Sequence, residues 1–278
     1  MTIIEPHIHM LSRPTDEYQA MYQAGIRACV EPSFWLGSNR RYAGSFFDYF
    51  RLILEFETVR AARFGIDHYC AIAMNPKEAD DRALADEVID GLAPYLDHPR
   101  CVAMGEIGLN AITPNEERAM VRQLRMAEER KMPVILHLPH VDKLRGTLRI
   151  LDIIKAEGLT VERIDVDHNT EETIKHTLDS GCYAGMTVYP YSKLNPQRVS
   201  AMVKQYGHAR VIVNGSADWG VSDPLSLVKV VNYMRGDGHG EAVIEDLVFN
   251  TAMKFYSASP NWKPDFAIQP LDPSVYQR

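Results

Sequence analysis

The chain has 278 residues, a length that suits a single barrel domain of about 250 residues. Hydrophobic residues make up 46% of it, enough to fill a large core, and the formal net charge of −7 offers no general attraction to nucleic acid or to anionic membranes. No apolar run approaches the roughly 20 residues of a membrane helix, and no signal-peptide pattern opens the chain. We therefore expect a cytoplasmic protein with no membrane partner.

Short apolar runs alternate with amphipathic stretches along almost the whole chain. The runs are rich in Val, Ile, Ala and Cys without polar alternation, which is typical of parallel strands buried on both faces. We predict strands at residues 2–9, 26–31, 68–74, 101–107, 134–138, 164–168, 183–188 and 210–214. We predict helices at residues 16–24, 47–63, 79–95, 116–130, 143–157, 171–179, 196–205, 224–235 and 241–256. This order indicates an α/β fold, either a closed (β/α)8 barrel or a large doubly wound sheet.

No composition shift divides the chain, so residues 1–256 are expected to form one domain. Residues 257–278 are a Pro-rich C-terminal tail, either packed on that domain or loosely ordered. The connection at residues 32–47 is unusually long and contains Trp35. Long loops within compact domains often serve function, so we expect a lid or substrate wall here; the alternative is an interface in a homo-oligomer.

Residues that commonly bind metals recur at the ends of the predicted strands. Two histidines lie two residues apart at the end of the first strand, so both side chains point the same way. The residues that close the fourth, fifth and sixth strands follow at intervals of 31, about one βα unit, and a carboxylate lies just past the eighth. The same ends of parallel barrel strands converge on one site. The six residues are His7, His9, Glu106, His137, His168 and Asp218.

A single buried histidine is usually a hydrogen-bonded packing residue rather than a ligand. Six metal-type residues at matching strand ends are different, because burying them without a cation would leave costly unpaired polar groups. The sequence therefore predicts one or two divalent ions. All ligands offer nitrogen or oxygen, which fits zinc best in our interpretation and also suits manganese, iron or nickel.

In these residues the chain resembles the TatD-like branch of the metal-dependent amidohydrolase superfamily. The resemblance runs in order from residue 3 to about residue 256, and residues 105–109, Gly-Glu-Ile-Gly-Leu, are its most specific part. It implies a TIM (β/α)8 barrel with Glu106 bridging two ions. One ion would be held by His7, His9, Glu106 and Asp218, and the other by Glu106, His137 and His168.

A bound divalent ion lowers the pKa of a water molecule, so the arrangement predicts a hydrolase that uses a metal-activated water. Asp218 is the candidate for orienting that water and taking its proton, with a pure ligand role as the alternative, and Glu106 is the second candidate catalytic residue. We expect a small-molecule ester, phosphoester, lactone or amide as substrate. Two alternatives remain: a metal-dependent deoxyribonuclease or phosphodiesterase, and a non-catalytic metal-binding barrel in a biosynthetic complex.

The neighbours of the ligands differ from the pattern of the TatD-like branch. Asn110 stands where an aspartate is usual, and His137 is followed by Leu-Pro-His rather than by a residue and an arginine. These differences argue against nucleic acid as the substrate.

Four further side chains are expected at the same rim as substrate-binding residues. Each also has an ordinary structural explanation, such as a salt bridge or simple packing. The four are Glu31, Trp35, His140 and Tyr189.

Overall fold

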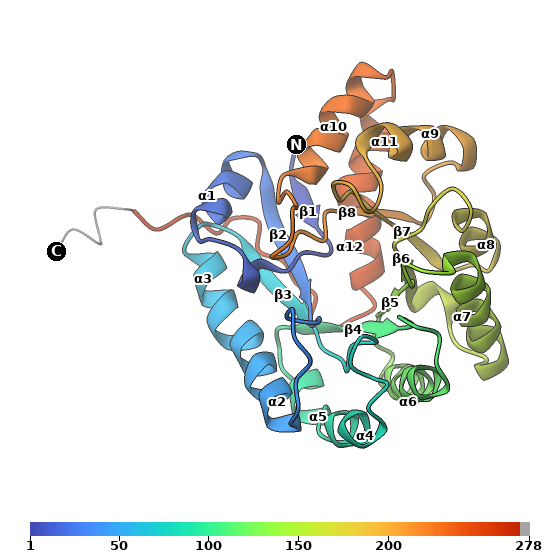
Figure 1. The fold of residues 1–278 in the computed structure, drawn as a ribbon. Coiled ribbons are helices and arrows are strands. Elements are labelled where there is room, and N and C mark those ends of the chain that lie inside the picture. Colours follow the sequence, from blue (N-terminus) through green and yellow to red (C-terminus); the bar gives the residue numbers. More distant parts are fainter. Residues whose placement is uncertain (273–278) are drawn as a thin grey trace.

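The computed structural model describes residues 1–272, and residues 273–278 of the expected tail lie outside the described part. Eight parallel strands follow one another in chain order, each hydrogen-bonded to the next. Figure 1 looks along the barrel and shows the helices surrounding it. The predicted TIM (β/α)8 barrel is confirmed. The strands are β1 (Ile3–Glu5), β2 (Ile26–Pro32), β3 (Asp67–Ala71), β4 (Cys101–Gly108), β5 (Val134–His137), β6 (Ile164–Asp167), β7 (Tyr183–Thr187) and β8 (Val211–Asn214).

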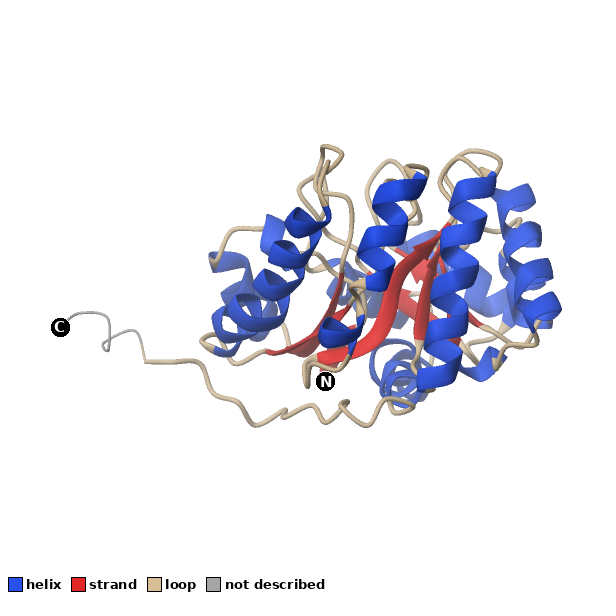
Figure 2. Ribbon diagram, turned by 90° about the horizontal axis from the view of Figure 1, so that it is seen from below, coloured by secondary structure: helices blue, strands red, loops and turns tan. Residues whose placement is uncertain are grey.

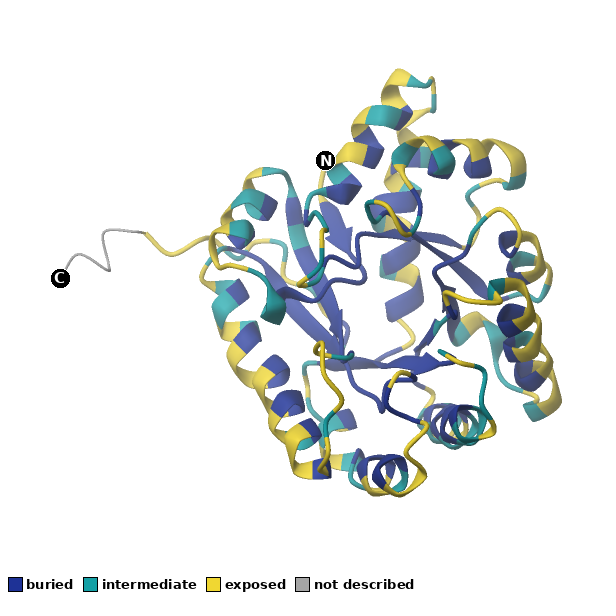
Figure 3. Ribbon diagram, in the orientation of Figure 1, coloured by how far each residue is buried: buried dark blue, intermediate teal, exposed yellow. Residues whose placement is uncertain are grey.

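The helices form the outer layer, with their apolar faces toward the strands and their polar faces exposed (Figure 3). Two of the longer helical stretches contain a π-helical turn. The helices are η1 (Met10–Ser12), α1 (Asp16–Gln23), α2 (Ala43–Arg51), η2 (Leu52–Glu57), α3 (Thr58–Ala62), α4 (Arg82–Asp90), α5 (Ala93–Leu96), α6 (Pro114–Arg130), α7 (Lys143–Glu157), η3 (Val161–Arg163), α8 (Ile174–Asp179), α9 (Pro196–Tyr206), α10 (Ser226–Gly236), α11 (Glu241–Glu245), η4 (Asp246–Asn250) and α12 (Thr251–Tyr256).

Strand alternation divides the core into an inner and an outer part. Ala28 and Val30 of β2 belong to a cluster that joins seven of the eight strands inside the barrel, whereas Cys29 between them packs toward the helices. Phe255 and Trp262 belong to the inner cluster and close the amino-terminal end of the barrel. The carboxyl ends of the strands are therefore the open end, where barrel enzymes carry their sites.

Backbone hydrogen bonds beyond the strands draw β8 and β1 together. The amide of Ser216 donates to the carbonyl of His7 at 2.7 Å, and the amide of His9 donates to the carbonyl of Ala217 at 2.8 Å. These bonds link the segment after β8 to the segment after β1. They place the first and last candidate ligands on the same side of the barrel mouth.

Several predicted elements differ from the structure. The first strand, expected over residues 2–9, ends at Glu5, so His7 and His9 follow β1 rather than close it. The helix expected over residues 79–95 is two helices, because α4 ends at Asp90 and α5 starts at Ala93. Gly91 between them lies directly under the ring of Phe47, leaving no room for a side chain. The long connection expected at residues 32–47 is shorter, because α2 already begins at Ala43. The remaining irregular segment is anchored by an ion pair between Arg40 and Glu78.

The described part of the C-terminal tail runs along one end of the barrel (Figure 2). Its backbone bonds to the first residue of β3 and to the residue that follows α3: the amide of Asp265 donates to the Asp67 carboxylate at 2.8 Å, and that of Leu271 donates to the Arg63 carbonyl at 2.8 Å. Residues 257–272 thus pack on the barrel. Within residues 1–272, no helix combines the length and apolar character that crossing a membrane requires.

Packing between β6 and β7 yields a stability prediction. A Cβ added at Gly185 would lie 2.2 Å from Oδ1 of Asp167 and 2.8 Å from its Cα. Because the backbone atom cannot move aside, Gly185→Ala should lower the free energy of unfolding by about 1–3 kcal/mol. Urea denaturation measures this. Gly44→Ala is the matched control, since nothing lies within 4 Å of its added Cβ, and equal stability of the two variants would contradict the expectation.

Candidate metal centre

Glu106 is carried to the barrel mouth by an irregular stretch of β4. The β4–β5 register shifts between Met104 and Ile107, at the position of Glu106. Gly105 packs against Ile135, where an added Cβ would lie 2.8 Å from the Cβ of that residue. Gly108 has φ +138° and lies against the backbone of His137. Both glycines are therefore required by close contact, which gives a physical reason for the Gly-Glu-Ile-Gly sequence.

The candidate ligands from four strands meet at one carboxylate oxygen. Oε1 of Glu106 lies 3.5 Å from Nε2 of His7, 3.4 Å from Nδ1 of His137 and 3.2 Å from Nε2 of His168. Nε2 of His9 lies 3.0 Å from Nε2 of His7. Two groups result whose ligand atoms all lie within 4.8 Å of one another, one made of His7, His9 and Glu106 and the other of Glu106, His137 and His168.

Hydrogen bonds on the far side of three rings determine which nitrogen each ring presents. His7 donates from Nδ1 to Oδ2 of Asp167 at 2.6 Å, and His9 donates from Nδ1 to the carbonyl of Pro32 at 3.1 Å. Thr187 donates its hydroxyl proton to Oδ1 of Asp167, so its oxygen accepts from Nδ1 of His168 at 2.6 Å. In each ring the proton is on Nδ1, and the Nε2 lone pair faces the centre.

The facing nitrogens of His7 and His9 test whether the residues fit a metal ion. With both protons on Nδ1, two Nε2 lone pairs face each other at 3.0 Å with no proton between them. Such an arrangement is repulsive unless a cation lies between the lone pairs. The donor set of neutral imidazoles and one carboxylate is also the usual one for zinc. The residues therefore fit a divalent ion.

The electrostatics of the site keep its ligands in the forms that bind metals. Burial lowers the pKa of His9 and of His168 well below the usual value, so both rings are neutral at pH 7. Burial alone would raise the pKa of Glu106, but its interactions with His7, His137 and His168 outweigh it and lower this pKa well below its ordinary value. Glu106 is therefore ionised.

Asp218 lines the same pocket but lies outside both groups of mutually close ligand atoms. Its Oδ1 accepts hydrogen bonds from the hydroxyl of Tyr189 and from the amide of Gly220, each at 2.7 Å. Within residues 1–272, no hydrogen bond reaches its Oδ2. The expected metal-ligand role of Asp218 stays a prediction, and the structure shows a carboxylate held by one oxygen with the other free.

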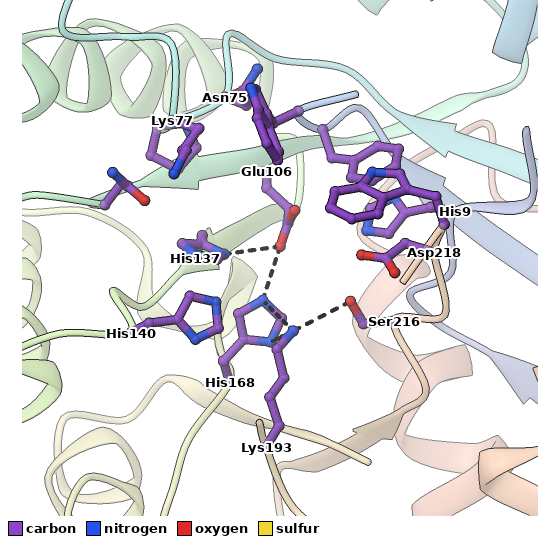
Figure 4. A pocket seen from close by; sticks show the side chains of 15 residues that line it. His9, Asn75, Lys77, Glu106, His137, His140, His168, Lys193, Ser216 and Asp218 are labelled. Atoms are coloured by element: carbon purple, nitrogen blue, oxygen red, sulfur yellow. Dashed lines mark hydrogen bonds and ion pairs between the residues drawn. The ribbon is translucent and has the colours of Figure 1, made fainter. Parts of the chain in front are cut away.

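The pocket above the ligands has a volume of about 260 Å³. Phe34 stacks on the ring of His9 with 3.7 Å between centroids, and Trp35 lies 5.7 Å from the half-exposed Trp219. His140 lies beside His137 on the same wall of the pocket (Figure 4), and burial lowers its pKa to about 4, so it is neutral at pH 7. Two of the expected substrate-binding residues, Trp35 and His140, therefore line this pocket.

The other two expected substrate-binding residues lie elsewhere. Tyr189 supports Asp218 from outside the pocket lining, and this contact together with burial raises the pKa of its hydroxyl to about 12. Glu31 is fully buried, where its carboxyl accepts from the amide of Leu11 at 3.0 Å and lies 2.9 Å from Nε2 of His68. This placement leaves Glu31 no contact with a substrate in the pocket.

Sequence reasoning missed three polar residues of the centre. Asp167, which orients His7, directly precedes a predicted ligand, and a carboxylate at a strand end was an available signal. Ser216, whose hydroxyl lies 3.5 Å from Nε2 of His7, has no such signal. Lys193 also has no sequence signal; it lies in the loop after β7, and its ammonium is 3.2 Å from Nδ1 of His168.

Comparison with known proteins identifies the family of the chain. The sequence profile of the family described as TatD related DNase matches residues 5–214, from β1 to the end of β8. The chain belongs to the TatD-related DNase family. It is 26% identical over 259 residues to an uncharacterized metal-dependent hydrolase of Methanocaldococcus jannaschii, a match that covers 91% of the chain and 99% of that relative.

Solved structures of TatD-like proteins have the same fold. A TatD-like protein from Archaeoglobus fulgidus superposes with a TM-score of 0.74 at 23% identity, covering 91% of this chain and 99% of that one. A TatD homolog from Escherichia coli has a TM-score of 0.66 at 18% identity, covering 92% and 98%. Membership of this family makes the chain a metal-dependent hydrolase.

The contact between His7 and Asp167 yields a prediction about metal affinity. Asp167→Asn removes the carboxylate that fixes the His7 ring, so zinc affinity should fall roughly 10- to 100-fold. Competition with a chromogenic chelator measures the affinity. Asp152→Asn, an exposed change on α7 that removes the same charge, is the control. Unchanged affinity in a folded Asp167→Asn protein would show that the contact does not orient the ligand.

Proposed function

We propose that this TatD-family hydrolase uses a metal-activated water to cleave a small-molecule ester, phosphoester, lactone or amide. The observation that carries the proposal is the shared oxygen of Glu106, which belongs to both metal-capable groups. Zinc is the ion that this set of imidazole and carboxylate ligands favours, and His7, His9 and Glu106 would hold one ion, with Glu106, His137 and His168 holding a second. When bound, such ions polarise the scissile group and lower the pKa of water.

The residues of the chain supply the remaining parts of the reaction. Asp218 has one oxygen fixed by Tyr189 and Gly220, so its Oδ2 is free to accept a proton from the attacking water. Neutral His140 offers a hydrogen bond from the wall opposite His9 (Figure 4). Phe34, Trp35 and Trp219 provide an apolar wall that reduces the access of bulk water.

The size of the pocket supports a small substrate. A volume of about 260 Å³ lies just below the range of roughly 300–1,000 Å³ found for pockets that hold drug-sized ligands. Nucleic acid is the second candidate, because the family is described as TatD related DNase and because Lys77 lies 5.2 Å from the ring of Trp35 at the pocket. An exposed aromatic beside a cation is a common way to bind single strands.

A substrate panel distinguishes the two candidates. Zinc-loaded protein should hydrolyse p-nitrophenyl acetate, bis(p-nitrophenyl) phosphate or a γ-lactone, while single-stranded DNA is left intact. Glu106→Gln, which removes the shared charge, should abolish turnover and zinc retention together. Cleavage of DNA alone, lost in Glu106→Gln, would identify the nuclease and rule out the small-molecule proposal.

A substitution at Asp218 tests its role in proton transfer. Asp218→Asn keeps an oxygen for Tyr189 and Gly220 but removes the basic oxygen, so kcat should fall by about 10²- to 10⁴-fold. Stopped-time assays with zinc content measured on the same sample separate the two expected roles of the residue. Lost turnover with full zinc content fits a general base, and lost zinc fits a ligand. Wild-type turnover would exclude both roles.

A further inference from the structure

Lys193 is presented to the pocket by a short ordered turn between β7 and α9. The amide of Leu194 donates to the Thr187 carbonyl at 3.0 Å, and that of Tyr189 donates to the Leu194 carbonyl at 3.1 Å. A guanidinium nitrogen of Arg198 also donates to the Lys193 carbonyl at 2.8 Å. The backbone that carries this lysine is thus fixed on both sides, and its side chain extends to the site (Figure 4).

The ammonium of Lys193 contacts the ring of His168 and the hydroxyl of Ser216. It lies 3.2 Å from Nδ1 and 3.3 Å from Nε2 of His168, and 3.5 Å from the hydroxyl of Ser216. Nearly equal distances to both ring nitrogens place it over the face of the ring, where no lone pair points. Within residues 1–272, no carboxylate oxygen lies within 4.0 Å of it. The N–H groups of this half-buried ammonium therefore lack a well-directed hydrogen-bond acceptor.

The charges around Lys193 are of both signs: Glu106, Asp167 and Asp218 act on it from beyond contact distance, and two further lysines lie near the pocket. Lys143 donates to the carbonyl of His168 at 3.0 Å, and Lys77 lies at the opposite wall of the pocket. Bound divalent ions at Glu106 would raise the positive potential further. With such ions compensating the charge of Glu106, an uncharged substrate would leave the ammonium with no anion in direct contact, which is costly, whereas an anionic substrate oxygen would compensate the charge.

We propose that Lys193 binds an anionic group of the substrate, a carboxylate or a phosphate, next to the bond that is hydrolysed. This inference rests on the proposed small-molecule hydrolase function and narrows its substrate class. The apolar wall of Phe34, Trp35 and Trp219 lines the same pocket, so the substrate class is a small organic anion with an apolar part.

Binding of small anions tests the proposal without any turnover. Calorimetry at pH 8 would measure inorganic phosphate and, separately, acetate on the zinc-loaded protein. Lys193→Met should weaken binding roughly 10- to 100-fold, as expected for a lost charge-assisted hydrogen bond. Lys193→Arg should restore most of it. Lys155→Met, an exposed change on α7 with the same loss of charge, should bind like wild type.

The two anions distinguish the two substrate chemistries. A loss confined to phosphate supports a phosphate-bearing substrate, and a loss confined to acetate supports a carboxylate. Equal binding by wild type and Lys193→Met at full zinc content overturns the proposal, as does failure of the wild type to bind either anion. If Lys193→Met loses zinc, the lysine supports the centre instead and the proposal is also wrong.

Kinetics separate this inference from the proposed function. In Lys193→Met, the ratio of kcat/KM for p-nitrophenyl phosphate to that for p-nitrophenyl acetate should fall at least tenfold relative to wild type and to Lys155→Met. If no substrate is cleaved by any variant but anion binding still depends on Lys193, the hydrolase proposal fails while the anion site stands. If a ten-nucleotide single strand binds through Lys193 and neither small anion does, nucleic acid replaces the small anion.

Discussion

The approach of three imidazole nitrogens to one oxygen of Glu106 is the constraint on which the site depends. A buried carboxylate is costly unless cations or hydrogen bonds surround it, and here His7, His137 and His168 present ring nitrogens to it. In the absence of a cation the same geometry opposes two lone pairs across 3.0 Å. The facing lone pairs of the centre are thus balanced only when a cation is bound. The site is pre-formed, because the barrel fixes the position of every strand end.

Asp167 joins the centre to the barrel interior. Its two oxygens contact the ring of His7, the amide of His168, the hydroxyl of Thr187 and the amide nitrogen of Asn214. Burial alone would raise the pKa of this carboxyl, but its interactions with His168, with the hydrogen-bonded ring of His7 and with Lys193 lower it below its usual value, so it is ionised. One carboxylate therefore aligns a candidate ligand that follows β1 with elements on β6, β7 and β8, and the ring it holds cannot turn independently of the barrel.

The sequence was informative wherever strand periodicity applied. Buried parallel strands produce continuous apolar runs, and the residues that end them point to one mouth, so the barrel and the cluster around Glu106 could be predicted. Glu31 shows the limit of that reasoning. It was expected at the rim, but β2 continues to Pro32, and the alternation of the strand directs Glu31 toward His68.

Residues on irregular backbone could not be predicted in this way. Lys193 reaches the pocket through a turn whose shape depends on hydrogen bonds to β7. No periodic pattern in the sequence predicts the position of this lysine. Asp167 and His168 are consecutive and should face opposite sides of a strand. The positive φ of 67° at His168 breaks the alternation, so both side chains reach the same site.

The contact between His7 and Asp167 joins residues 160 positions apart, and the bonds from Ser216 to His7 span still more of the chain. During synthesis the first two histidines therefore emerge long before anything can orient them. An incomplete nascent chain holds a flexible His-x-His pair, whose affinity for metal is that of a short peptide. Selective uptake of the ion must wait until the barrel has closed, which makes loading of this hydrolase one of the last events of its folding.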